Sequence, residues 1–288
     1  MKSYSRRRLL GAAALGIPGY AYARHVEPNW LEFTERTCRL PGLARPWKLA
    51  HLSDLHASRD VSNALIERAF AMAIAAKPDV ICVTGDFVTR AQGFDAAWLT
   101  GALRKLAQAA PAYASLGNHD GGLWAEQSGG FSSIREISKI VTDAGLTLLH
   151  NASTTIHAEL QLVGVGDLWS ASIDAPAAFA HAQPDLPTIL LAHNPDSKAI
   201  LANQRWHLML SGHTHGGQVV VPFVGLSPAP VWDRDYIAGL NPWRAPGEDP
   251  NDFRPRWVHT SRGVGNSNGV RFNCRPEVTV LHLLPESV

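Results

Sequence analysis

Short apolar runs alternate with longer amphipathic stretches along the chain from residue 47 onward. The runs end in Gly, Asp or His, and they predict strands at 47–53, 79–84, 111–116, 160–165, 187–192 and 207–211. Between the runs, Ala, Leu and Ile recur at helical spacing, which predicts helices at 62–76, 95–109, 132–144 and 196–203. Alternating strands and helices are typical of an α/β domain with a largely parallel sheet.

After residue 216 the pattern changes to strands without helices, predicted at 218–221, 256–260 and 277–284. A second sheet from this half, packed on the first, predicts a sandwich of two mixed sheets flanked by helices, with layers in the order α-β-β-α. Residues 222–256 contain seven prolines, which exclude continuous helix and central strand and predict a long surface loop. Such a loop either contributes to function or is a variable insertion.

The first 23 residues differ from the rest in charge, because they contain four basic side chains and no acidic one. The basic cluster precedes the apolar stretch LLGAAALGIPGY at 9–20 and then Ala21-Tyr22-Ala23, which matches a small-x-small cleavage pattern. The stretch is too short to span a membrane, which requires about 20 apolar residues. Residues 5–10, SRRRLL, resemble a twin-arginine export signal.

This leader predicts three regions, namely a signal peptide at 1–23, an N-terminal extension at 24–46 and the main domain at 47–288. It also predicts the twin-arginine export machinery as a partner, and a periplasmic location or one on the outer face of the cytoplasmic membrane. The alternatives are a frayed basic N-terminus or an uncleaved anchor. Trp169, Trp232 and Trp243 are candidates for a substrate wall or a peripheral membrane contact, although core packing explains single tryptophans equally well.

Net charge and cysteine count argue against two classes of protein. The 288 residues have a net charge of +1, and without the leader 22 basic and 25 acidic residues remain. This balance argues against a nucleic-acid binder that uses a basic face. Three cysteines are too few for a disulfide framework, although a bridge between Cys38 and Cys274 is compatible with an oxidising compartment.

Five polar motifs follow the predicted strands, at the carboxyl ends where α/β sheets build their sites. They are Asp54-Leu55-His56, Gly85-Asp86, Gly117-Asn118-His119-Asp120, His193-Asn194 and Gly212-His213-Thr214-His215-Gly216-Gly217-Gln218. Side chains two residues apart in an extended segment project the same way, so Asp54 with His56, and His213 with His215, are each expected to face one region.

The motifs offer seven metal donors, which are two carboxylates, four imidazoles and one amide oxygen. Seven donors exceed one tetrahedral site and suit two divalent cations that share the carboxylate of Asp86. Nitrogen and oxygen donors without thiolate favour Mn, Fe or Zn. Two cations about 3.5 to 4 Å apart generate hydroxide from bound water and stabilise the charge on a phosphoryl group. The predicted reaction is therefore phosphoester hydrolysis.

The order DxH, GD, GNH(D/E), H and GHxH resembles the calcineurin-like metallophosphoesterase superfamily over residues 47–218. The closing PEVTVLHL at 276–283 resembles the last strand of its exported bacterial phosphodiesterase branch. The resemblance implies one metal held by Asp54, His56, Asp86 and His215, and a second held by Asp86, Asn118, His193 and His213. It also implies that His119 is the catalytic histidine near the leaving oxygen and that Asp120 orients its imidazole.

Each motif alone has a simpler explanation. Asp54 suits a helix N-cap, GNHD suits a turn, and His213 and His215 suit a solvated loop. Jointly these explanations require five coincidences at strand ends, so the metal site is preferred. In the Gly-rich stretch 261–272, Arg262, Asn266 and Arg271 are interpreted as a turn with surface arginines, and Asp167 is interpreted as a turn residue.

The leading hypothesis is an exported phosphodiesterase with a dinuclear metal centre and a phosphoester substrate. A more specific alternative is hydrolysis of a nucleotide-lipid or glycolipid pyrophosphate, because related proteins include UDP-diacylglucosamine hydrolases. Such a substrate is lipid-linked and cytoplasmic, and the export signal weighs against it. The alternative from another class is a catalytically silent scaffold of the same fold. The presence of every metal-ligand residue of the motifs argues against this alternative.

Overall fold

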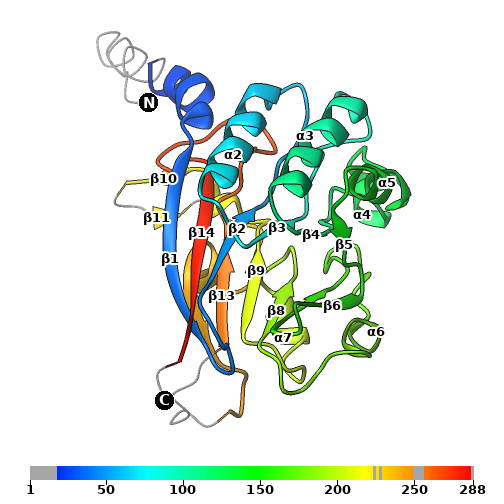
Figure 1. Cartoon of the computed structure of the whole chain (residues 1–288). Helices are drawn as coiled ribbons and strands as arrows, with labels where there is room; N and C mark the ends of the chain where they lie inside the picture. The colour runs from blue at the N-terminus through cyan, green and yellow to red at the C-terminus, as the bar shows by residue number, and fades with distance from the viewer. Residues whose placement is uncertain (1–17, 223–224, 227–228, 249–255, 287–288) are drawn as a thin grey trace.

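Two six-stranded mixed sheets pack face to face, and helices cover the outer face of the first sheet (Figure 1). The computed structural model describes residues 18–222, 225–226, 229–248 and 256–286, so the predicted leader lies outside the described residues up to residue 17. The predicted sandwich of two mixed sheets is confirmed. Among the described helices, none is both long and apolar enough to cross a bilayer.

The first sheet has the order β1-β14-β2-β3-β4-β5. Its strands are β1 (Glu32–Leu40), β14 (Glu277–Pro285), β2 (Trp47–Leu52), β3 (Val80–Thr84), β4 (Ala112–Ser115) and β5 (Thr147–Leu148). β2 to β5 are parallel to one another, whereas β14 runs antiparallel to β2 and parallel to β1. The carboxyl ends of β2, β3 and β4 therefore meet at one edge of this sheet.

The second sheet has the order β12-β13-β9-β8-β7-β6. Its strands are β12 (Gly239–Trp243), β13 (Arg256–Thr260), β9 (Leu208–Ser211), β8 (Thr188–Leu191), β7 (Leu160–Gly164) and β6 (Ala152–Ile156). The four central strands are parallel, and β12 and β6 pair antiparallel at the two edges. A small ribbon pairs β10 (Val220–Val221) with β11 (Gly225–Leu226).

Three long helices cover the first sheet, namely α2 (Asn63–Ala75), α3 (Ala96–Ala109) and α5 (Arg135–Asp143). The side chains of Ser62 and Asp95 cap the first two by accepting backbone N–H bonds. The short helices are α4 (Leu123–Gln127), α6 (Ala175–Phe179), α7 (Ser197–Ile200), η1 (Tyr22–Val26), η2 (Glu27–Asn29), η3 (His215–Gly217) and η4 (Arg234–Tyr236).

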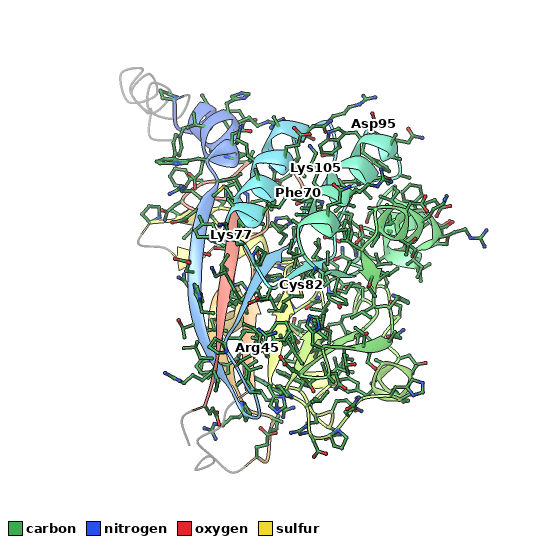
Figure 2. All side chains as sticks on the ribbon, viewed as in Figure 1. Arg45, Phe70, Lys77, Cys82, Asp95 and Lys105 are labelled. Carbon is green, nitrogen blue, oxygen red and sulfur yellow. The ribbon has the colours of Figure 1, made fainter. Side chains whose placement is uncertain are left out.

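Buried residues alternate between two cores along the central strands. Ile81 joins the core beneath the helices, whereas Cys82 joins the core between the two sheets. Both faces of these strands are covered, which explains why the sequence shows continuous apolar runs there. Phe70 of α2 packs in the core beneath the helices, whereas Lys105 and Asp95, labelled on α3 and just before it in Figure 2, are exposed.

Several elements differ from the sequence prediction, among them β1, β6, β12 and the helix predicted at 196–203. β1 lies inside the predicted extension and was missed because most of its side chains are exposed, as expected for an edge strand with little apolar pattern. β12 contains Pro242 and lies at the other sheet's edge, where proline is tolerated. β6 is also an edge strand. The helix predicted at 196–203 is only Ser197–Ile200, because the chain returns to the sheet at Leu208.

All three cysteines are buried free thiols. Cys38 packs in the core between the sheets, whereas the thiol of Cys274 lies 3.2 Å from the carbonyl oxygen of His215. The bridge between Cys38 and Cys274 is therefore not formed.

Candidate metal centre

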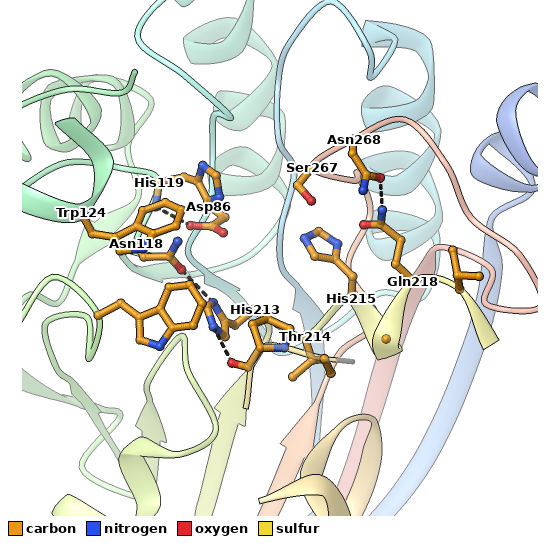
Figure 3. Close-up of a pocket in the computed structure, with 15 residues that line it drawn as sticks. Asp86, Asn118, His119, Trp124, His213, Thr214, His215, Gln218, Ser267 and Asn268 are labelled. Atoms are coloured by element: carbon orange, nitrogen blue, oxygen red, sulfur yellow. Dashed lines mark hydrogen bonds between the residues drawn. The ribbon is translucent and has the colours of Figure 1, made fainter. Parts of the chain in front are cut away.

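The loops after β2, β3, β4, β8 and β9 bring the predicted donors to one edge of the sandwich. Four of the donors, Asp86, Asn118, His213 and His215, line a cavity of about 410 Å³ (Figure 3). Three sets of residues can each hold a metal ion, because the donor atoms within a set all lie within 4.8 Å of one another. The sets are Asp54 with His56 and His215, His56 with Asp86 and His119, and Asp86 with His193 and His213.

Backbone strain is concentrated at these donors. Five of them have φ in the left-handed region, which is unfavourable for residues other than glycine, and they are Asp54 (52°), His56 (47°), Asp86 (53°), His213 (68°) and His215 (50°). The expected extended conformation is therefore wrong, although Asp54 and His56 do face one region, as predicted. His213 and His215 face different donor sets, because the chain leaves the strand at Ser211 and turns through Gly212.

Two motif glycines are required by close packing. A Cβ on Gly117 would collide with the Asp86 carboxylate, and a Cβ on Gly212 would collide with Ser53 and the Asp54 carboxylate. The absence of a side chain at Gly117 therefore allows its loop to approach the Asp86 carboxylate, and the absence of one at Gly212 allows its loop to approach the Asp54 carboxylate.

The first donor set surrounds the carboxylate of Asp54. The Nε2 atoms of His56 and His215 lie 3.1 Å apart, and Nε2 of His215 lies 3.5 Å from Oδ1 of Asp54. Nε2 of His56 lies 3.5 Å from Oδ2 of Asp86. All these side chains are buried, and their nitrogen and carboxylate oxygen atoms converge on one point.

The second donor set lies on the other side of Asp86. Nε2 of His193 is 3.1 Å from Oδ2 of Asp86, and its Nδ1 donates to the carbonyl of Thr84 at 2.7 Å. His213 donates from Nε2 to the carbonyl of Pro230 at 3.1 Å, which leaves its Nδ1 facing Oδ1 of Asn118 at 2.8 Å. In a neutral imidazole that Nδ1 is an acceptor facing an acceptor, and a bound cation satisfies both atoms.

Burial controls the protonation of this cluster. Burial lowers the pKa of His56 and of His213 to about 3 each, and it lowers the pKa of His215 well below its usual value. Burial opposes charge on His193 too, but the Asp86 carboxylate raises the pKa of His193 well above its usual range. His56, His213 and His215 are therefore neutral and ready to bind a divalent cation. A cation at His193, by contrast, must displace its proton, because metal ligands must be deprotonated.

His119 lies at the rim of the cavity, beside the metal donors. Its Nδ1 donates to the carbonyl of Thr89 at 2.8 Å, so Nε2 is the atom left to face the cavity. Its ring contacts His56 at 4.9 Å and Trp124 at 4.6 Å between centroids. These contacts fix the orientation of the imidazole.

Asp120 does not orient His119, contrary to the expectation from the resemblance. Its buried carboxylate instead accepts the backbone N–H groups of Asp86, Phe87 and Gly117 at 2.7 to 2.8 Å. It is the Thr89 carbonyl that holds the imidazole. Asp120 therefore shapes the loops after β3 and β4, and it supports the position of Asp86 rather than the tautomer of His119.

Arg271 is the main residue that sequence reasoning missed. It is completely buried, and its Nη2 lies 3.4 Å from Nδ1 of His215. The guanidinium also donates to the backbone carbonyls of Arg262, Gly263, Gly265 and Cys274. The interpretation as a surface arginine is therefore wrong for Arg271. Arg262 is engaged by Glu277 and Glu32, and neither arginine lines the cavity.

The tryptophans flagged in the sequence have three different environments. Trp169 lines the cavity together with Trp124, with ring centroids 5.4 Å apart. Trp232 is 79% exposed. Trp243 is buried and stacks on Trp206. Asp167 is buried, and its Oδ1 accepts the N–H of Ser170, which agrees with a turn role.

The two-sheet sandwich and its cluster of carboxylates and imidazoles are those of a metal-dependent hydrolase. The model of the calcineurin-like phosphoesterase family matches residues 48–217, and the chain belongs to this family. The superfamily predicted from the motifs is thereby confirmed.

Three relatives align with nearly the whole chain. It is 41% identical over 287 residues to the phosphodiesterase YaeI of Escherichia coli (strain K12), covering 97% of this chain and 99% of YaeI. It is 28% identical over 300 residues to the metallophosphoesterase YkuE of Bacillus subtilis (strain 168), covering 98% and 99%. It is 27% identical over 326 residues to the UDP-2,3-diacylglucosamine pyrophosphatase LpxG of Chlamydia muridarum (strain MoPn / Nigg), covering 96% and 97%.

Proposed function

We propose that this protein is a phosphodiesterase that holds two divalent cations, Mn, Fe or Zn, on either side of Asp86. The observation that carries this proposal is the position of Oδ2 of Asp86, which lies 3.5 Å from Nε2 of His56 and 3.1 Å from Nε2 of His193. A single carboxylate oxygen thus faces both donor sets. Oδ1 is engaged by the backbone N–H of His119 at 2.9 Å, which fixes the carboxylate plane.

The proposed assignment follows the two donor sets. Asp54, His56 and His215 hold one cation with Asp86, and Asn118, His193 and His213 hold the other with Asp86. When bound, the two cations activate water and stabilise the charge on the phosphoryl group. Nε2 of His119 faces the cavity, and in its protonated form it donates to the oxygen of the departing alcohol.

The cavity walls favour a diester over a monoester. Among the described residues, no Lys or Arg lines this cavity, and its walls include Trp124, Trp169 and Pro230. A monoester carries up to two negative charges on the scissile phosphate, whereas a diester carries one and adds a second organic group. The aromatic wall suits that second group. The phosphodiesterase relative supports the same choice.

Metal-dependent cleavage of a diester tests this proposal. We expect purified protein loaded with Mn or Zn to hydrolyse bis(p-nitrophenyl) phosphate faster than p-nitrophenyl phosphate, and we expect chelation to abolish both activities reversibly. The measurement is p-nitrophenolate release before and after dialysis against chelator and metal. If neither ester is cleaved at any metal loading, the silent scaffold becomes the better account.

The LpxG relatives favour a second candidate, a lipid-linked pyrophosphate. The apolar cavity wall is compatible with a lipid-bearing substrate, and UDP-2,3-diacylglucosamine belongs in the same substrate panel. Its hydrolysis at a higher kcat/KM than that of simple diesters would favour this candidate over the phosphodiesterase.

We also propose that the protein is exported by the twin-arginine route and contacts the membrane peripherally. The support is the basic and apolar leader, in which Tyr20 is 63% exposed, together with Trp30, which is 52% exposed on the segment that follows the leader. Fusion of residues 1–30 to a periplasmic reporter is expected to direct export, and substitution of Arg6 and Arg7 by Lys should abolish it. Equal export of both fusions would contradict this route.

A further inference from the structure

A second cavity adjoins the metal centre on the side of His119. It has a volume of about 690 Å³ and is lined by residues 58–60, 89–93, 129–130 and Ser267. Ser267 also lines the metal-site cavity, where Figure 3 labels it beside Asn268 at the rim. Thr89 connects the two regions, because its carbonyl holds His119 while the residue itself lines the second cavity. The two cavities are therefore neighbours that share Ser267.

Two arginines, Arg59 and Arg90, line the second cavity. Ala57 and Val88, two residues before the arginines, form a parallel bridge that brings the two segments together. A Cβ on Gly93 would lie 3.6 Å from Cγ of Arg59. The absence of a side chain at that glycine leaves room beside the guanidinium.

The positive charge of this pair is not neutralised within the part of the chain that the structure describes. Neither guanidinium there has a hydrogen-bond or ion-pair partner. The acidic residue of the cavity is Asp60, and Arg24 already binds its carboxylate at 2.7 Å. The metal-site cavity, by contrast, is lined by no described arginine or lysine.

We propose that Arg59 and Arg90 form a subsite for a second anionic group of the substrate, a phosphate or carboxylate carried on the His119 side of the scissile phosphodiester. Guanidinium groups bind such oxyanions with paired N–H donors. This inference rests on the proposed function, because it deepens the substrate class of the same site. The preferred substrate is then a diester in which one alcohol carries a further oxyanion.

Linear alkane-α,ω-bisphosphonates of three to ten carbons test this subsite, each compared with the alkylphosphonate of equal length. Isothermal titration calorimetry on the metal-loaded full chain gives both affinities. At the chain length that spans both sites, we expect the bisphosphonate to bind roughly tenfold more tightly than the alkylphosphonate. The reason is that its second phosphonate forms charge-assisted hydrogen bonds with the arginines while the first phosphonate is held at the metals. Two identical ends alone give only a twofold gain. An ω-phosphonocarboxylate series distinguishes a phosphate from a carboxylate preference.

The double variant Arg59→Gln/Arg90→Gln should lose this gain while its affinity for the alkylphosphonate stays within about twofold of wild type. Both affinities, for the bisphosphonate and for the alkylphosphonate, are measured on one preparation of the variant. Their ratio is therefore unaffected by a fraction of unfolded protein. Arg205→Gln is the matched control, because Arg205 precedes β9 at the opposite end of the sheet, and it should keep both the gain and the activity.

Three outcomes decide between the claims. A gain that is lost only in the double variant supports the subsite. No gain at any length in wild type, or a gain retained in the double variant, overturns it even if bis(p-nitrophenyl) phosphate is cleaved. An arginine-dependent gain in a protein that cleaves no ester supports anion binding and contradicts the proposed function instead.

Discussion

Replacing Asp86 by Asn is expected to remove bound metal and phosphodiesterase activity together. Oδ2 of Asp86 is the atom that faces Nε2 of both His56 and His193, so an amide NH₂ or a neutral oxygen at that point weakens both metal sites. Metal catalysis contributes several kcal/mol, which corresponds to a loss of roughly a thousandfold or more in kcat/KM. Elemental analysis of the purified variant and its rate with bis(p-nitrophenyl) phosphate measure the two effects.

Asp79→Asn is the matched control for this variant. Asp79 immediately precedes β3 and Asp86 follows shortly after it, but the carboxylate of Asp79 accepts the backbone N–H of Lys48 at the far end of the strand. This control should keep its metal and its activity. Two equivalents of metal retained by Asp86→Asn would show that Asp86 does not bridge the two donor sets.

The double-sided burial of the central strands made most of the fold predictable. Runs such as Val80–Thr84 are apolar at successive positions, because alternate side chains enter different cores. Edge strands lack that signal. β1 keeps most of its side chains exposed and is paired on one side only, through contacts with β14 from the far end of the chain, which no local pattern reveals.

The motifs identified the donor residues, but not their geometry. Asp54 and His56 looked like neighbours on an extended segment, whereas both adopt left-handed backbone conformations after β2 ends. Such strain arises from contacts between loops, including the N–H of His213 donated to the Asp54 carboxylate. Arg271 was missed for the same reason, because its carbonyl partners come together only when the 262–274 segment folds beneath His215.

Replacing His119 by Ala is expected to lower turnover by about a hundredfold to ten-thousandfold while leaving the metal content unchanged. Its Nδ1 is occupied by the Thr89 carbonyl, and the proposed metal donors do not need its Nε2. The loss should depend on the departing alcohol. An alkyl leaving group needs a proton more than p-nitrophenolate does, so a methyl p-nitrophenyl diester and a dialkyl diester should be affected by different factors. Hydrolysis rates with both esters measure the loss of turnover, and elemental analysis measures the metal content.

Metal content decides between two roles for His119, because its ring nitrogen lies within 4.8 Å of donor atoms of His56 and Asp86. If His119→Ala loses metal as well as turnover, His119 is a ligand and the proposed proton donor must be sought elsewhere. His181→Ala, which replaces an exposed histidine outside the cavity, should change neither quantity. Equal losses with alkyl and nitrophenyl leaving groups would favour hydrogen bonding to the phosphoryl oxygens over proton donation, since such bonding does not depend on the departing alcohol.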